Sequence, residues 1–396
     1  MLNKSDFRNN IMYYRFLKSK EDLLQSTLNI DLNKIVPFNP TKGKSEITKY
    51  QNTVNFDISY DKQFSVKISS NFESNYDLEN IDHPLIGMYS DASLFVAEEC
   101  LTISNWFQSW LNNNTLFKNN IFKSINIKVF PGKYEKKQVM LSIYFSEYKI
   151  NPEWKMGEQL FLNYLTNILV KNDMNLASLY YKFVDDPEFK IVYYNSDIYQ
   201  EMDGLRIKIT PDIEVDKSDI LLYQTLKRVF SQHKIGNIPI VNLNSQFNNY
   251  HTSSSPPTYI SKILHNLCEL LINVDENPTD SNTKFSLNNN LNEINNICWV
   301  NYENSMEEVL DNIEKINVII NDSTEALNQE SIQKIYKYKD KIELIILLSF
   351  DTQDVRHHKL KSNIELLREN FELENIYLLD SLPFSKFVKT LSIFTV

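Results

Sequence analysis

Short apolar runs recur through the second half of this chain, separated by segments with helical periodicity. They occur about every 20 to 30 residues, which is the spacing expected when crossover helices join parallel strands. The runs span residues 238–243, 270–274, 297–300, 316–320 and 342–348. Strands that are apolar throughout are usually buried on both faces of a sheet. We therefore predict a parallel, doubly wound α/β sheet, ending in an antiparallel hairpin whose strands are residues 376–379 and 391–396.

The first half of the chain predicts a different architecture. Apolar and polar residues alternate in the manner of half-buried strands, and helical patterns lie between them. The strand patterns span residues 50–59, 64–69, 125–129 and 139–145, and the helical patterns span 14–28, 92–111 and 152–170. A chain of 396 residues exceeds what one hydrophobic core usually holds. We therefore predict two domains, an α+β domain with antiparallel sheet at 1–225 and an α/β domain at 226–396.

The composition narrows the possible functions. Hydrophobic residues make up 42% of the chain, and no apolar run approaches the roughly 18 to 20 residues that a membrane span needs. The formal net charge is -10, and residues 229–396 carry 14 Lys and Arg against 22 Asp and Glu. RNA affinity depends on neutralising phosphates with Lys and Arg. We therefore expect no membrane contact, and we expect any RNA contact to come mainly from the first half.

Cysteine and glycine are both scarce. The three cysteines are too few and too scattered for a disulfide framework or a Cys-x-x-Cys metal site, which favours an intracellular protein, cytoplasmic or nuclear. The basic residues of the first twenty leave a mitochondrial location open, although residues 14–28 fit an ordinary amphipathic helix better. Six glycines in the whole chain leave no Gly-rich loop of the kind that cradles phosphates.

Several segments, taken in order, resemble the tRNA (uracil-5-)-methyltransferases, which methylate C5 of uridine in RNA, and especially their eukaryotic branch. The segments are Tyr50-Gln51-Asn52-Thr53, the run from Gly204 to Pro211 with Leu222-Tyr223 after it, residues 319–324, residues 347–352 and Asp380-Ser381-Leu382-Pro383. They stand where the family has Tyr-Arg-Asn-Lys, the lead-in to its methyltransferase domain, Asp-Pro-Pro-Arg, Ser-Cys-Asn-Pro and Asp-x-Phe-Pro. The resemblance implies a Rossmann-type class I methyltransferase fold for residues 226–396.

The resemblance also implies that the catalytic groups are missing. The family's reaction requires a thiolate that adds to C6 of uracil and a carboxylate that removes the C5 proton after methyl transfer from S-adenosylmethionine. Phe350 stands at the position of the nucleophile and Lys389 at that of the base, and the hydroxyl of neighbouring Ser349 is scarcely ionised at neutral pH. The family's glycine-rich turn is replaced by residues 242–250, and its Phe-Gln-x-Asn glutamine is absent at 215–218. We therefore expect no catalytic residue and a degenerate member, a pseudoenzyme.

Three residues are candidates for binding. Asp275 follows the second apolar run, where the resemblance implies an acid that binds the ribose hydroxyls of S-adenosylmethionine, although it also fits a solvated acid before a turn. Tyr50 and Asn52 are candidates for RNA contact. Four further tyrosines would either stack on unpaired bases or pack within the sheet. They are Tyr180, Tyr181, Tyr193 and Tyr194.

Other polar groups suggest chemistry less strongly. His357 and His358 point about 100° apart on a helix and so seldom share a metal ion, and no metal site is predicted. His251 with the serines at 253–255 lacks the strand-turn-helix of a hydrolase nucleophile.

Three functions stay open. The first is an inactive relative that binds tRNA, another structured RNA or a protein partner, without cofactor. The second is an active S-adenosylmethionine-dependent tRNA (uracil-5-)-methyltransferase with a rearranged site. The third is a protein-interaction scaffold, which the acidic second half favours.

Overall fold

The structure is a computed structural model, and contacts divide its chain into two units. The larger unit comprises Met1–Ile47, Met202–Leu205 and Lys217–Val396, and the smaller unit comprises Thr48–Glu201 and Arg206–Asp216. This division differs from the expected domains at 1–225 and 226–396, because Lys4–Leu28 and Ile35–Phe38 contact elements near the C-terminal end of the chain. The residues described are 4–38, 53–60, 66–70, 97–113, 122–131, 137–146, 162–167, 169–171, 175–186, 188–202, 205–211, 217–234, 238–243, 264–275, 297–301, 306–322, 333, 335–349, 354–380 and 389–396.

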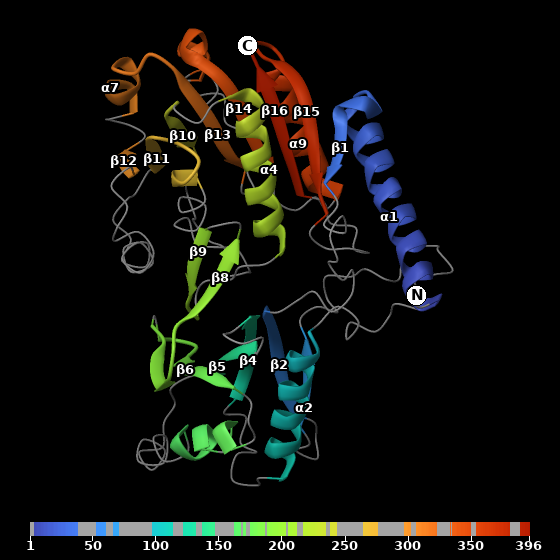
Figure 1. Ribbon diagram of the computed structural model, residues 1–396, viewed down its shortest axis with the longest axis vertical. Coiled ribbons are helices and arrows are strands. Elements are labelled where there is room, and N and C mark those ends of the chain that lie inside the picture. Colours follow the sequence, from blue (N-terminus) through green and yellow to red (C-terminus); the bar gives the residue numbers. More distant parts are fainter. Residues whose placement is uncertain are drawn as a thin grey trace. The chain divides into compact units, whose positions relative to one another are not determined.

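The larger unit contains an eight-stranded sheet in the order β1-β15-β16-β14-β13-β10-β11-β12 (Figure 1). Its strands are β1 (Ile35–Phe38), β10 (Ile240–Leu243), β11 (Leu271–Asp275), β12 (Ile297–Asn301), β13 (Ile316–Asp322), β14 (Ile342–Ser349), β15 (Glu372–Leu379) and β16 (Lys389–Thr395). Neighbouring strands are parallel except where β16 pairs with β14 and β15. The predicted doubly wound sheet and its closing antiparallel hairpin are therefore confirmed.

The central strands are buried on both faces, and the strand order shows where the winding of the sheet reverses. The centre of β14 is inaccessible to solvent, with Ile345, Ile346 and Leu347 all 0% exposed. A strand buried on both faces needs helices on both sides, and a parallel neighbour needs a long crossover connection. The chain accordingly runs outward from β10 through β11 to β12 and then crosses back to β13, on the other side of β10. The direction of winding reverses between β10 and β13.

Helices flank this sheet. They are α1 (Lys4–Leu28), α4 (Lys217–His233), the short α7 (Met306–Asp311) and α9 (Asp354–Leu367), with 3₁₀ turns at Leu32–Lys34 and Lys339–Lys341. Helix α1 packs against α9, and α4 packs against β15. The buried stripe of α1 recurs at helical spacing, and the left-handed Asn29, with φ of 51°, ends the helix. Its members are Tyr13, Leu17, Lys20, Leu24 and Leu28.

Strand β1 explains why the start of the chain belongs to the larger unit. It adds to the edge of the sheet in parallel with β15, with Ile35 opposite Ile376 and Phe38 opposite Leu379 (Figure 1). The predicted helix at 14–28 is therefore present as part of α1, but it covers the α/β sheet and not the α+β domain. No described helix is long and apolar enough to cross a membrane.

The smaller unit contains a six-stranded sheet in the order β3-β2-β4-β5-β6-β7. Its strands are β2 (Thr53–Tyr60), β3 (Val66–Ser70), β4 (Phe122–Pro131), β5 (Lys137–Phe145), β6 (Leu176–Phe183) and β7 (Lys190–Tyr194). All described pairs are antiparallel except β5 with β6, which the helical residues 162–167 and 169–171 separate in sequence. The α+β architecture predicted for this part of the chain is therefore present.

One face of the six-stranded sheet forms the core of the smaller unit. Helix α2 (Glu98–Asn113) and the helical residues after β5 cover it, burying Phe107, Phe122 and Phe145 almost completely. A separate two-stranded sheet joins β8 (Ile198–Met202) to β9 (Leu205–Ile209). Lys128 on β4 is itself 0% exposed and donates from Nζ to the backbone oxygens of Thr210 and Pro211, at 2.9 and 2.8 Å. These two bonds fix the segment that follows β9.

Candidate functional site

The carboxyl ends of the parallel strands form the candidate site of the larger unit. In doubly wound sheets, ligands bind outside these ends at the point where the winding reverses, which here lies between β10 and β13. Polar residues stand at or next to the carboxyl ends of these strands. They include Asn242 on β10, Asp275 on β11, Asn301 on β12, Asp322 on β13 and Ser349 on β14.

Asp275, the residue expected to bind ribose, lies at the carboxyl end of the second parallel strand. It is the last residue of β11 and lies opposite Asn301 of β12 in the parallel register. Only its backbone is described. Tyr50 and Asn52, the candidates for RNA contact, lie outside the described residues, as do Phe350, His251 and the serines beside it. For His357 and His358, the structure describes the backbone within α9 and not the side chains.

A pair of buried amides lies beside the reversal point and was not found from the sequence. Asn242 and Asn273 stand opposite each other on β10 and β11, and Asn242 Nδ2 donates to Asn273 Oδ1 at 2.8 Å. Asn317 on β13 is opposite Ile240, so its side chain shares the face of Asn242. Within the described part of the chain, Asn242 Oδ1 and both side-chain polar atoms of Asn317 have no hydrogen-bond partner. The sequence did carry a signal for this site, because each of these asparagines interrupts a run of apolar residues.

The sheet brings together residues at or beside the two positions that correspond to the family's nucleophile and base. Ser349, the last residue of β14, is opposite Thr390 on β16, and Lys389 begins β16 opposite Leu379. Ser349, which precedes position 350 in the sequence, and Lys389 therefore lie at the same edge of the sheet. Ser349 is 6% exposed, and Lys389 is half-buried.

The described cysteines do not supply the thiolate that this chemistry needs. Cys100 and Cys268 are both buried, Cys100 in the smaller unit and Cys268 just before β11. Burial raises the pKa of each thiol to about 12, and the neighbouring Glu99 carboxylate adds to the effect at Cys100. The side chain of Cys298 lies outside the described residues. A thiol with so high a pKa is neutral and is a poor nucleophile at physiological pH.

We expect iodoacetamide at pH 8 to leave Cys100 and Cys268 unmodified in the native protein. With a pKa of about 12, only about one thiol in ten thousand is ionised at that pH, and burial blocks access as well. Peptide mass spectrometry after timed labelling measures the modification, and the same labelling of the urea-unfolded protein serves as the control. Rapid native labelling of either thiol would contradict the burial described here.

A buried ion pair ties α1 to the carboxyl end of β15. Lys20 Nζ lies 2.5 Å from Asp380 Oδ1, and the two residues are 3% and 1% exposed. Tyr13 is buried beside this pair, and its pKa is raised far above its ordinary value by burial first and by the Asp380 charge second. Asp380 belongs to the Asp380-Ser381-Leu382-Pro383 segment, whereas the sequence motifs do not include Lys20 or Tyr13. The network fixes the point from which the chain leaves β15 toward Lys389.

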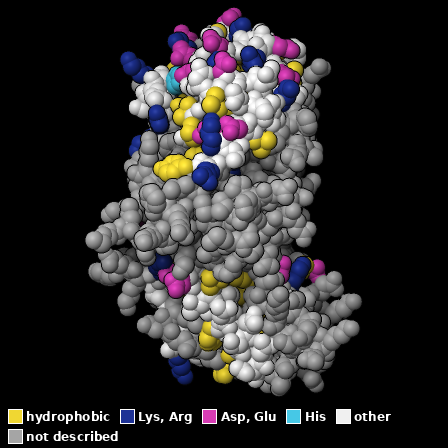
Figure 2. Space-filling model, turned by 90° about the vertical axis from the view of Figure 1, so that its right-hand side faces the viewer, with side chains coloured by type: hydrophobic (Ala, Val, Ile, Leu, Met, Phe, Trp, Pro, Cys, Tyr) yellow, Lys and Arg dark blue, Asp and Glu magenta, His cyan; other side chains and the backbone are white. Residues whose placement is uncertain are grey.

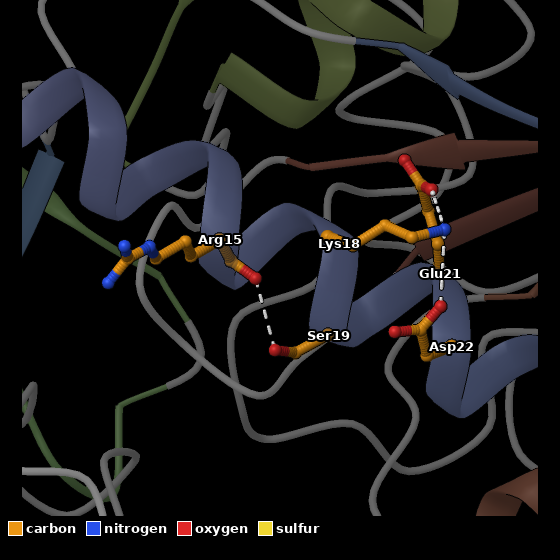
Figure 3. Close-up of polar contacts among 5 residues, drawn as sticks. All are labelled: Arg15, Lys18, Ser19, Glu21 and Asp22. Carbon is orange, nitrogen blue, oxygen red and sulfur yellow. Dashed lines mark hydrogen bonds and ion pairs between the residues drawn. The ribbon is translucent and has the colours of Figure 1, made fainter.

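On the solvent-facing side of α1, one lysine is paired with two carboxylates of the same helix (Figure 3). Lys18 lies 3.2 Å from both Glu21 and Asp22, and Ser19 Oγ donates to the backbone oxygen of Arg15 at 3.0 Å. Figure 2 likewise shows acidic and basic side chains intermingled over the face of the larger unit turned to the viewer. Among the described residues, no cluster of His, Cys, Asp and Glu is suited to a metal ion.

This chain matches known proteins in structure but not in sequence. No model of a known protein family and no curated protein matches the sequence. Among solved structures, the tRNA (uracil-54, C5)-methyltransferase of Pyrococcus abyssi, in complex with S-adenosyl-L-homocysteine, matches with a TM-score of 0.58 and 12% identity over 97% of this chain and 83% of that chain.

Two further matches have lower TM-scores. A putative SAM-dependent methyltransferase from Streptococcus mutans matches with a TM-score of 0.38 and 10% identity, over 75% of this chain and 79% of that one. TYW2 of P. horikoshii, in complex with MeSAdo, matches with a TM-score of 0.36 and 10% identity, over 65% of this chain and 87% of that one. At 12% identity, the structural likeness to the Pyrococcus abyssi protein shows that the two chains share a fold, and nothing finer. The chain therefore has the Rossmann-like α/β fold of the S-adenosylmethionine-dependent methyltransferases.

Proposed function

We propose that this protein is a catalytically inactive relative of the RNA uracil-5-methyltransferases that binds tRNA or another structured RNA inside the cell. One observation carries the proposal. In the sequence, the positions matching the family's nucleophile and base hold Phe350 and Lys389. Ser349, which precedes the first of them at the end of β14, lies at the same edge of the sheet as Lys389 at the start of β16. A phenyl ring cannot add to C6 of uracil, and a lysine brings a proton where one must be removed.

The donors at the carboxyl edge fit S-adenosylmethionine only in part. Asp275, at the end of β11, stands where an acid would hold the ribose hydroxyls, and the cofactor would supply the methyl group if it bound. The turn after β10 carries no glycine through residue 250, whereas close approach of the backbone to the cofactor usually needs one. We therefore propose that the protein binds RNA without this cofactor.

The purified protein, incubated with tRNA transcripts and S-adenosylmethionine, is expected to form no 5-methyluridine. Mass spectrometry of the nucleosides measures the product, and an active uracil-5-methyltransferase in a parallel reaction shows that the assay works. Product formed by the wild-type chain and lost from Asp275→Ala would overturn the proposal and support an active enzyme with a rearranged site.

Binding assays test the other half of the proposal. Titration with fluorescently labelled tRNA is expected to show saturable binding that weakens as salt rises, because some phosphates are neutralised in the complex. Calorimetric titration with S-adenosylmethionine separates cofactor binding from RNA binding. A chain that binds neither RNA nor cofactor would fit the protein-interaction scaffold.

A further inference from the structure

A cluster of tyrosines in the smaller unit is fixed by one carboxylate. Asp197, just before β8, accepts hydrogen bonds from Tyr194 Oη at 2.6 Å and Tyr199 Oη at 3.3 Å, and it pairs with Lys208 Nζ at 2.7 Å. Partial burial opposes ionisation of Asp197, but the bonds from Lys208 and Tyr194 outweigh it and lower its pKa below the ordinary value. The carboxylate therefore stays charged at neutral pH and holds both phenol groups in place.

An arginine lies flat on one of these rings. The Arg206 guanidinium carbon is 3.7 Å from the centroid of the Tyr199 ring, which is the geometry of a cation–π stack between β9 and β8. The Arg206 side chain is 61% exposed, and its ion pair with Glu201 is long, at 3.9 Å between two exposed groups. Such pairs are weak in water. The guanidinium therefore presents its outer face and most of its donors to solvent.

The aromatic character extends onto the neighbouring strands. Tyr180 on β6 contacts the Phe189 ring edge to face, and Lys182 Nζ lies 4.9 Å from the centroid of that ring. Tyr194, at the end of β7, is 50% exposed although its hydroxyl is bonded to Asp197. Aromatic rings and cations thus alternate across β6, β7, β8 and β9.

We propose that this tyrosine–arginine surface stacks on unpaired bases of an RNA. We define it as Tyr180, Lys182, Tyr194, Tyr199, Arg206 and Lys208. The inference rests on the proposed function and names the contact surface for it. Every base offers a flat face to an aromatic ring or a guanidinium plane, and interleaved cations can meet the phosphates between bases. A peptide would need an apolar groove, whereas this surface is polar and charged between its rings.

The structure divides the four tyrosines singled out in the sequence. Tyr181 is 8% exposed and belongs to the core cluster, and Tyr193 packs against the same cluster. Those two are therefore excluded from stacking. Tyr180 and Tyr194 lie on the same face of the sheet, because Tyr194 is opposite Ser178 on β6 and Tyr180 is two residues further along that strand. The smaller unit also carries more Asp and Glu than Lys and Arg. Stacking is consequently expected to contribute more to binding than phosphate contact.

The test compares variants of the full chain in binding to a fluorescent tRNA. Tyr194→Ala and Arg206→Ala are each expected to raise the Kd about 5- to 100-fold, the range seen when one stacked base loses its partner. Tyr194→Phe keeps the ring and is expected to bind like the wild type. Tyr164→Ala removes a tyrosine that is 53% exposed elsewhere in the same unit, and it should also bind normally. Circular dichroism and thermal melts show whether each variant is folded.

The outcomes separate this inference from the proposed function. If the wild type binds tRNA and Tyr194→Ala and Arg206→Ala bind equally well, the surface is not the contact, while the proposed function stands. If the wild type binds no RNA, both fail. A fully paired RNA duplex that competes as well as an RNA with a single-stranded loop would also overturn stacking. Arg206→Ala is expected to reduce the slope of log Kd against log salt by roughly 0.7 if Arg206 contacts one phosphate.

Discussion

Replacing Lys20 by methionine is expected to lower the free energy of unfolding of the larger unit by about 3–5 kcal/mol, the usual cost of leaving one partner of a buried ion pair uncompensated. Lys20 and Asp380 are almost fully enclosed, so the remaining carboxylate would be shielded from solvent. Chemical denaturation followed by circular dichroism measures the change. The ion pair joins residues 360 positions apart, and its loss should loosen α1 from β15.

Two further variants decide whether burial is the cause. Lys18→Met removes a lysine from the exposed side of the same helix, where its side chain is 50% exposed, and it is expected to change stability little. The double variant Lys20→Met with Asp380→Leu removes both charges and should recover most of the loss, because an apolar pair of similar size often replaces a buried ion pair without cost. If Lys20→Met were as stable as the wild type, the described network would be wrong.

Replacing Asn317 by valine is expected to raise the free energy of unfolding by about 1–3 kcal/mol, the cost of a buried polar group without a hydrogen bond. Asn317 is 0% exposed on β13, and within the described part of the chain neither of its side-chain polar atoms has a hydrogen-bond partner. Valine also suits a parallel strand that is buried on both faces. Denaturant titration of the variant beside the wild type gives the difference.

Asn242→Val provides the matched comparison on the neighbouring strand. Asn242 is buried on the same face, but its Nδ2 donates to Asn273 Oδ1 at 2.8 Å. Valine there removes this donor from a buried acceptor, so no gain in stability is expected. Equal stabilisation by both substitutions would show that the hydrogen bond contributes nothing. A loss of stability in Asn317→Val would show that its amide has a partner in the native protein.

The parallel sheet was predictable because its central strands are continuous apolar runs, whereas the segments between them are more polar. Residues 342–348 coincide with β14, and 316–320 lie within β13, since strands buried on both faces cannot tolerate the polar alternation of an exposed strand. Strand β1 was missed for the opposite reason. It has four residues, contains Pro37 and lies at an edge, so it has no pattern that distinguishes it from a loop.

Residues of the candidate site that stand at the ends of strands were predictable from the sequence. Contacts between residues far apart in the sequence, such as Lys20 and Asp380, were not. Asp275 was expected after the second run and does end β11. Its contact with ribose stays a prediction, as do the roles of Tyr50 and Asn52. Lys20 was missed because lysine on an amphipathic helix is read as solvent-exposed, and its partner Asp380 is remote in sequence. Its place in the buried stripe between Leu17 and Leu24 was the signal available.

The pairing of β1 with β15 also sets an order of events during synthesis. Proteins emerge from the ribosome amino end first, and non-local contacts form only once both partners are available. Ile35 must therefore wait for Ile376 before it can take its place in the sheet. The whole smaller unit, Thr48–Glu201 with Arg206–Asp216, is synthesised between these two strands and can fold before β15 is available. Until translation nears its end, α1 and β1 therefore lack the parts of α9 and β15 that bury their apolar side chains in the folded chain.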